Sequence, residues 1–505
     1  MKGKKIVSTL LALLLLASLP VSALAAEWDI SKGDITVNAG SGGQTVTQGG
    51  GAAVEDSAPV ITGSSQDNTL TINAEKDQTA SVTLSGVNID VSGAGKAAVS
   101  TTGEGNVSIE LNGENTLKSG EDHAGLEKNN GGSLTIQDED KNGKLTAEGG
   151  DWGAGIGGGD EGNGNNIAIS GGEIKATGGV GGAGIGGGWA GDGSNITISG
   201  GEVTATGGLY GAGIGGGYEG NGNNIAISGG KIKATGGLYG AGIGGGDARE
   251  SYNGNGSDIT ISGGEVTAIG GYLGAGIGGG SAGDSYNGNG SDITISGGVV
   301  TAIGGKFGAG IGGGCEGIGN NIAISGGEVK AIGGVSGAGI GGGWWGKGKD
   351  ITVSGAAKLK VQGGVEDDYG GVGAGIGDGG SYADGSQIPG AEVEPDTSGL
   401  LTTGWIEYYA PGADMEKDKP TSTTTGKPTE PTEPTEPGKP TEPIEPAVPE
   451  QPEAERGMDA PLYFITDRDG RAVRCRAERK GGVLTVTVDA DFAVLTGRLS
   501  GIRTL

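Results

Sequence analysis

The chain has 505 residues, 120 of them glycine, and a formal net charge of −28. Nucleic-acid binding depends on clustered positive charge, so this excess of carboxylates excludes a nucleic-acid partner. Hydrophobic residues make up only 33% of the chain. That is little for a globular core, but it is enough for a repeat protein whose units each bury a thin slice of core.

Residues 1–26 have the pattern of a secretory signal peptide. Three lysines precede an apolar run that ends at Leu19, and residues 23–25 supply a small-residue cleavage site. The run is too short to span a membrane comfortably, and no second apolar stretch of about 20 residues follows it. We therefore expect a secreted, extracellular protein without membrane insertion, which can associate with the cell surface.

A five-residue motif, Gly-Ala-Gly-Ile-Gly, recurs at intervals of 29 to 36 residues. Its eight copies begin at Gly153, Gly182, Gly211, Gly240, Gly274, Gly308, Gly337 and Gly373. A fixed period in this range is typical of solenoids, in which each unit stacks on the next. Every unit also contains two short strand patterns and no helical period. The sequence therefore predicts an all-β fold, a right-handed parallel β-helix (β-solenoid) of roughly 13 coils over residues 27–410.

One unit, residues 182–210, indicates which side chains face inward. Alternate side chains of a strand point to opposite faces, which places six apolar residues in the core: Ala183, Ile185, Ile196, Ile198, Val203 and Ala205. Thr197, Glu202 and the glycines of the motif then face outward. We therefore expect the motif to leave a flat, open strip of bare backbone, which we call the glycine strip.

Aromatic residues flank the glycine motif, although they make up only 4% of the chain. They are the candidate carbohydrate-binding residues: Trp152, Tyr210, Tyr239, Tyr272 and Phe307 just before the motif, and Trp189, Tyr218, Trp344 and Trp345 just after it. We expect them at the two edges of the glycine strip. One interpretation is that the rings cover the turns and shield the core. The other is that sugar rings lie flat against them, and the sequence supports both.

The residue before the first isoleucine of each unit is Asn or Asp, as in Asn166 and Asn195. Stacked side chains of this kind can satisfy backbone groups through a ladder of hydrogen bonds, and this is the favoured interpretation. The alternative is Ca²⁺ held between coils, for which the candidate metal ligands are Asp258, Asp292 and Asp350.

Glutamates open the following strand, as at Glu173 and Glu202, and lysines such as Lys175 stand two residues later. We expect a solvated face with pairing of opposite charges. Glycoside hydrolysis needs two carboxylates at a fixed separation, and these rows specify no such pair. His123, the only histidine, has no evident partner and is expected at a packed turn. No catalytic residue is predicted.

The chain changes character after the repeats. Residues 411–457 are rich in Pro, Thr and Glu and predict a disordered, semi-rigid linker. Residues 458–505 resume strand alternation and predict a short, incomplete C-terminal β module. This region is a candidate for contact with a cell-wall or surface partner. Cys315 and Cys475 lie on opposite sides of the linker, and a disulfide between them is a minor alternative.

Taken together, these segments resemble a known family. Residues 28–31 (Trp-Asp-Ile-Ser), residues 105–117 and the Gly-Ala-Gly-Ile-Gly-Gly-Gly coils are similar to those of secreted, calcium-binding, carbohydrate-binding-domain parallel β-helix proteins of Firmicutes. The resemblance covers about residues 27–380. It implies a pectate-lyase-like fold, binding of plant-cell-wall polysaccharide and Ca²⁺ as a cofactor. It carries over no individual calcium ligand.

The leading hypothesis is an exported, non-catalytic β-helix that binds plant-cell-wall-type glycans along an aromatic-edged glycine strip. One alternative is a structural surface adhesin or spacer without a glycan site. Another is an enzyme, either a pectate-lyase-like polysaccharide lyase or a glycosidase. A lyase commonly uses a basic residue beside calcium-binding carboxylates, and Arg249 is the only arginine within the repeats.

Overall fold

The computed structural model describes residues 26–248, 254–281 and 288–426, and the backbone of four short strands nearer the C-terminus. The chain divides into two units, residues 1–431 and 432–505. The predicted signal peptide up to residue 25 and most of the predicted linker lie outside the described residues. In the second unit, β42 (Ile465–Thr466) pairs with β43 (Ala472–Val473), and β44 (Cys475–Lys480) pairs with β45 (Val483–Val488).

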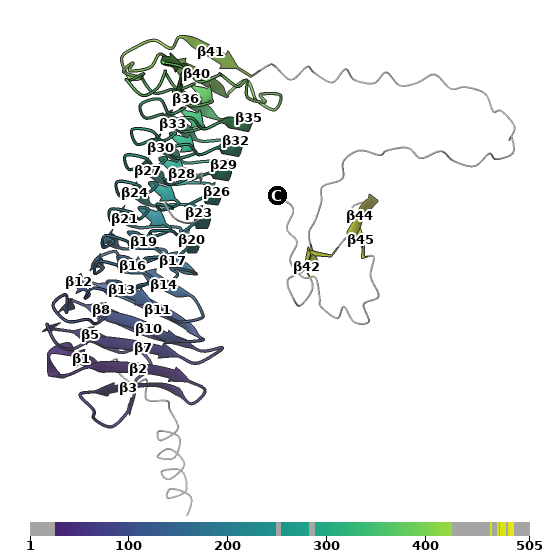
Figure 1. The fold of residues 1–505 in the computed structure, drawn as a ribbon. Helices are drawn as coiled ribbons and strands as arrows, with labels where there is room; N and C mark the ends of the chain where they lie inside the picture. The colour runs from purple at the N-terminus through teal and green to yellow at the C-terminus, as the bar shows by residue number, and fades with distance from the viewer. Residues whose placement is uncertain are drawn as a thin grey trace, which may run out of the picture. The chain divides into compact units, whose positions relative to one another are not determined.

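The first unit is a stack of coils built on three parallel sheets (Figure 1). Sheet A contains β1 (Glu27–Asp29), β5 (Val60–Thr62), β8 (Thr79–Ser85), β11 (Asn106–Asn112), β14 (Leu134–Gln137), β17 (Ile167–Ile169), β20 (Gly193–Ile198), β23 (Gly222–Ile227), β26 (Gly256–Ile261), β29 (Gly290–Ile295), β32 (Gly319–Ile324) and β35 (Gly348–Val353). Sheet B contains β2 (Ile35–Gly40), β7 (Leu70–Ala74), β10 (Val99–Gly103), β13 (Leu126–Lys128), β16 (Ile156–Gly157), β19 (Ile185–Gly186), β22 (Ile214–Gly215), β25 (Ile243–Gly244), β28 (Ile277–Gly278), β31 (Ile311–Gly312), β34 (Ile340–Gly341) and β37 (Ile376–Gly377). Sheet C contains β6 (Ser64–Ser65), β9 (Asn88–Asp90), β12 (Glu114–Lys118), β15 (Lys144–Glu148), β18 (Glu173–Thr177), β21 (Glu202–Thr206), β24 (Lys231–Thr235), β27 (Glu265–Ile269), β30 (Val299–Ile303), β33 (Glu328–Ile332), β36 (Lys358–Gln362) and β40 (Trp405–Tyr409).

Each coil passes from sheet B to sheet A and then to sheet C, as β19, β20 and β21 do, and the next coil repeats the path. Equivalent residues stack in register: Ile185 on Ile214, Ile196 on Ile225 and Val203 on Ile232. The predicted parallel β-helix is therefore confirmed. Within the described residues each sheet has twelve parallel strands, close to the coil number predicted from the period.

Antiparallel strands extend the stack at both ends. At the first end β3 (Gly43–Gln48) and β4 (Val54–Glu55) add to β2, next to the short 3-10 helix η1 (Ile30–Lys32). At the other end β41 (Ser422–Thr425) pairs with β40, and β38 (Ser381–Ala383) pairs with β39 (Ser386–Ile388). Paired strands thus continue past residue 410, the C-terminal limit that the sequence predicts for the β-helix. Among the residues that the structure describes, no helix has the length and apolar composition that a membrane span needs.

The core lies between the three sheets and has the composition that strand alternation predicts. Ile196, Ile198, Val203, Ala205 and Ile185 are all fully buried, while Glu202 is exposed on the outer face. Burying an isoleucine stabilises the fold by roughly 1.5–3 kcal/mol. Because these residues recur in every coil, the small contribution of each coil is repeated along the whole stack.

The glycine motif, in contrast, is not an open strip. Only Ile185 and Gly186 of the copy at 182 form a strand, and the Ala183 N–H donates to the Gly187 carbonyl at 2.9 Å, which closes the motif into a compact loop. Residues 182–188 are buried. A Cβ on Gly184 would lie 2.6 Å from the Gly213 carbonyl oxygen of the next coil. The prediction of an exposed glycine strip is therefore wrong. These glycines are buried because they allow the backbones of neighbouring coils to pack directly against each other.

The backbone conformation explains why Asn or Asp precedes the first isoleucine of each unit. Asn195, Asn224, Asp258 and their equivalents have φ between 52° and 58°, a left-handed conformation that Asn and Asp tolerate better than other non-glycine residues. The Asn224 amide donates to the Asn195 side chain at 2.6 Å, so these side chains form a ladder as predicted. They are exposed, so the ladder lies on the surface.

Candidate functional site

Nine aromatic residues form a column over the loops of the glycine motif. In its first run the ring centroids of Trp152 and Trp189 lie 4.6 Å apart, those of Trp189 and Tyr218 4.2 Å, and those of Tyr218 and Tyr210 5.1 Å. Tyr239 stacks on Tyr210 at 5.5 Å. These spacings are those at which aromatic pairs stabilise one another.

The second run of the column begins at Tyr272, on the coil after Tyr239. The Tyr272 and Phe307 centroids are 5.6 Å apart, Phe307 and Trp344 are 5.3 Å apart, and Trp344 and Trp345 are 5.8 Å apart. Phe307 is 9% exposed, whereas Tyr272 is 44% and Trp345 50% exposed. The column therefore combines rings that are packed into the protein with rings that present a face to solvent.

Aromatic residues from before and after the motif meet in this one column. The Trp189 N–H donates to the Trp152 carbonyl at 2.8 Å, and the Trp344 N–H donates to that of Phe307 at 2.8 Å. The two loops converge because the motif folds back on itself. The prediction of aromatic rows at two separate edges is wrong, although the structure does bring all nine residues together into these two runs.

An exposed apolar ridge runs beside the column. It consists of one residue per coil over four consecutive coils: Val180, Leu209, Leu238 and Tyr272. Their exposed fractions are 38%, 41%, 43% and 44%. Backbone hydrogen bonds between consecutive coils hold them in line: the N–H groups of Tyr210, Tyr239 and Leu273 donate to the carbonyls of Val180, Leu209 and Leu238. Sequence reasoning missed this ridge, although the period alone aligns its four residues.

A loop near the C-terminal end of the β-helix lies against the second run of the column. We call residues 366–370 the clasp loop. The Trp344 Nε1–H donates to the Tyr369 carbonyl at 3.0 Å, and the Gln387 amide donates to that of Asp367 at 2.6 Å. The Asp367 carboxylate pairs with the Lys306 ammonium at 3.1 Å. These contacts fix an ordered group of charged and aromatic side chains around Lys306.

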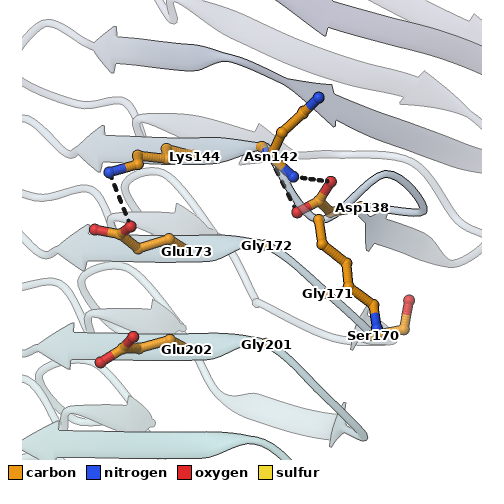
Figure 2. Close-up of a pocket in the computed structure, with 11 residues that line it drawn as sticks. Asp138, Asn142, Lys144, Ser170, Gly171, Gly172, Glu173, Gly201 and Glu202 are labelled. Carbon is orange, nitrogen blue, oxygen red and sulfur yellow. Dashed lines mark hydrogen bonds and ion pairs between the residues drawn. The ribbon is translucent and has the colours of Figure 1, made fainter.

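A separate groove of about 330 Å³ opens where sheet A turns into sheet C (Figure 2). Gly171, Gly172 and Gly201 line it, together with acidic and basic side chains. Within it the Lys144 ammonium lies 3.0 Å from the Glu173 carboxylate, and the Glu202 carboxylate stands on the coil below Glu173 in the figure. Glu202 in turn pairs with Lys231 at 3.0 Å.

The glutamates that open several strands of sheet C are therefore paired with lysines. This agrees with the predicted pairing of opposite charges. The pairs form along the row from coil to coil, as between Glu328 and Lys358 at 2.8 Å, rather than with the lysines two residues later. Hydrogen bonding to Lys358 and its charge lower the pKa of Glu328. A lowered pKa suits Glu328 to a solvated face and not to the role of a general acid, whose pKa must be raised.

A buried polar cluster surrounds β13, and sequence reasoning missed it. The Glu127 carboxylate lies 2.6 Å from His123 Nδ1 and accepts from the Asn129 amide at 2.5 Å. The Lys128 ammonium donates to the Asn130 carbonyl at 2.6 Å. Burial lowers the pKa of Lys128 to about 8. His123 thus has a partner, contrary to our expectation. The sequence contains a signal for this cluster, because Glu127 aligns with Gly157 of the next coil, and Gly157 is buried. A charged residue at a buried position of the repeat needs a polar partner.

The candidate metal ligands do not fit a calcium site. Asp258 and Asp292 lie on adjacent coils, but Asp350 is two coils further, beyond Asn321, whose amide donates to Asp292 at 2.6 Å. All three aspartates are exposed. Across residues 26–426, leaving out the two undescribed inserts, no three His, Cys, Asp or Glu side chains are grouped so as to hold a metal ion.

Cys315 is a buried free thiol whose backbone N–H donates to the Leu273 carbonyl, and the side chain of Cys475 is outside the described residues. Burial raises the pKa of the Cys315 thiol to about 12. Only the thiolate reacts readily, so alkylation at pH 8 should be about a thousandfold slower in folded than in unfolded protein. Iodoacetamide labelling of a Cys475→Ser variant, followed by mass spectrometry with and without urea, measures this. Rates within tenfold of each other would contradict the burial.

The coils match one known repeat. The family model described as "Beta helix repeat" matches seven segments: residues 141–160, 167–189, 196–218, 225–247, 259–281, 293–315 and 322–344. This supports a parallel β-helix family. No curated protein and no solved structure matches the chain. Apart from the first, each matched segment begins in the sheet A strand of a coil, and all seven end at the third residue after a copy of the glycine motif. Together they contain every residue of the aromatic column except Trp345.

Proposed function

We propose that the chain is an exported, non-catalytic protein that binds a polysaccharide along the aromatic column and the apolar ridge. The observation that carries the proposal is the alignment of exposed apolar side chains, one per coil, from Val180 to Tyr272, beside open aromatic faces at Tyr272 and Trp345. A polysaccharide is a linear repeat of flat units with apolar C–H faces. A ladder of apolar side chains along the stack suits such a ligand.

The charge of the molecule supports the same choice. With a net charge of −28, an aligned row of exposed apolar side chains is unusual and supports the proposal of an interaction site. Glu173, Glu202 and Glu328 of sheet C are paired with lysines, which favours the column and ridge as the surface best suited to a ligand. Export is part of the proposal, because the proposed ligand is an extracellular polysaccharide. It is supported by residues 1–26, which have the pattern of a signal peptide.

Affinity electrophoresis through gels containing cellulose derivative, pectin or xylan tests the proposal. We expect at least one glycan to retard the wild-type protein. Tyr272→Ala and Trp345→Ala should each weaken that binding about threefold to tenfold, since they remove one stacking surface. Their melting temperatures should stay close to that of wild type, because both side chains are already about half exposed.

Tyr218→Ala and Phe307→Ala serve as matched controls, because those rings are 8% and 9% exposed. Removing a buried ring costs about 3 kcal/mol or more, so these variants should melt at a lower temperature. If no glycan retards the wild-type protein, the proposal is wrong.

A structural adhesin or spacer is the second candidate. It is favoured by the ring-on-ring packing of Trp152, Trp189 and Tyr218, which stabilises the stack whether or not a ligand binds. Under this alternative the exposed-ring variants would behave as wild type in every gel, while the buried-ring variants would still lose stability.

A further inference from the structure

Lys306 lies at the centre of a cluster that combines aromatic rings with an ion pair. Its ammonium is 4.7 Å from the ring centroid of Phe307, 5.5 Å from that of Tyr272 and 5.4 Å from that of Tyr369. These distances are typical of cation–π contacts. The Asp367 carboxylate completes the cluster at 3.1 Å, and both charged side chains stay partly accessible, at 29% and 21%.

The cluster is held in place by the backbone and does not depend on a ligand. The Tyr369 N–H donates to the Asp367 carboxylate at 2.9 Å, and Asp367 and Gly370 bridge each other across the turn. Tyr369 and Tyr272 are 61% and 44% exposed. Two open rings therefore flank a donor and an acceptor whose positions are already set, which lowers the ordering cost of binding.

We infer that this cluster is a subsite for a neutral, hydroxyl-rich sugar unit, and that the polysaccharide is a neutral glycan and not a uronate-containing one. The inference rests on the proposed function and names the class of its ligand. The aromatic faces take the C–H face of the sugar ring, Asp367 accepts from a hydroxyl group, and Lys306 donates to a hydroxyl or ring oxygen.

Charge decides between neutral and acidic glycans. The positive charge of Lys306 is already balanced by Asp367, and the neighbouring Glu366 and Asp368 are exposed carboxylates. A uronate arriving here would meet net negative potential on a strongly acidic protein. Hydrogen bonding to Asp367 and Tyr272 raises the pKa of Lys306, so the ion pair persists at neutral and mildly alkaline pH.

The test compares neutral xylan and hydroxyethyl cellulose with polygalacturonate in affinity gels, using the chain from residue 27 onward. We expect retardation by a neutral glycan and none by polygalacturonate. Lys306→Met keeps the alkyl chain over the rings, and Asp367→Asn keeps an acceptor for the Tyr369 N–H. Each should weaken neutral-glycan binding about tenfold. Lys233→Met, on the exposed face of sheet C, is the matched control and should bind as wild type.

Three results would overturn the inference, and each has a different meaning. If Tyr272→Ala and Trp345→Ala weaken binding while Lys306→Met and Asp367→Asn do not, the subsite is wrong and the proposed function stands. If polygalacturonate retards the protein more strongly and Lys306→Met abolishes this, the ligand is acidic. If neither kind of glycan retards the protein, the proposed function fails and the subsite fails with it.

Discussion

Gly215→Ala is expected to destabilise the β-helix by about 2–5 kcal/mol. Gly215 has φ 134°, a region that L-residues rarely adopt, and its added Cβ would overlap the carbonyl oxygen of Gly244 on the next coil. Overpacking a close-packed interior costs about 1–3 kcal/mol, and backbone strain adds about 1–2 kcal/mol. Urea denaturation followed by circular dichroism measures the change as a lower midpoint.

Gly93→Ala is the matched control for this prediction. Nothing lies within 4 Å of a Cβ at Gly93, and its φ is not positive. The variant should therefore differ from wild type by less than about 0.5 kcal/mol. Equal effects of the two substitutions would mean that glycine in the motif is not required for coil packing.

Lys128→Met should abolish a rise in stability that the wild-type protein gains above pH 8. Burial lowers the pKa of Lys128 to about 8 in the folded protein, below its value in the unfolded chain. Between pH 8 and about 10.4 the unfolded state binds more protons, so stability rises with pH through this window. The free energy of unfolding of wild type relative to Lys128→Met should increase by roughly 3 kcal/mol across it.

Comparison with the variant is needed because other groups oppose this rise. Burial raises the pKa of Cys315 to about 12 and that of Tyr408 to about 12, so their contributions fall as pH rises above their unfolded values. These terms cancel in the difference between wild type and Lys128→Met. Lys233→Met, an exposed lysine, should show no such difference. A flat difference for Lys128→Met from pH 7 to 10.5 would refute the burial of that ammonium.

Most of the fold could be predicted because its signals are local and periodic. The alternation at Ile196 and Ile198 identifies the core, and the recurrence of the motif identifies the coils. The same alternation failed at residues 182–188, because a rule for extended strands was applied to a segment in which only Ile185 and Gly186 are extended. The bond from the Ala183 N–H to the Gly187 carbonyl closes this segment, and no periodicity reports such a loop.

The candidate site was predicted in part for a similar reason. The period places the aromatic residues on consecutive coils, and so the column could be foreseen, but its convergence from both sides of the motif depends on the closed loop. The contact between Lys306 and Asp367 joins the repeats to a loop inserted between β36 and the eighth copy of the motif. The clasp loop has no counterpart in the other units, so the repeat offers no alignment that would have found this pair.

Hydrogen–deuterium exchange of the chain with and without a bound neutral glycan most directly tests whether the column and ridge are the binding surface. We predict slower exchange in residues 178–182, 207–211, 236–240 and 270–274 and in the clasp loop, with little change in sheet C. Protection confined to the groove around Gly171, Gly172 and Glu173 would contradict the account and place the binding surface at that charge-lined groove instead.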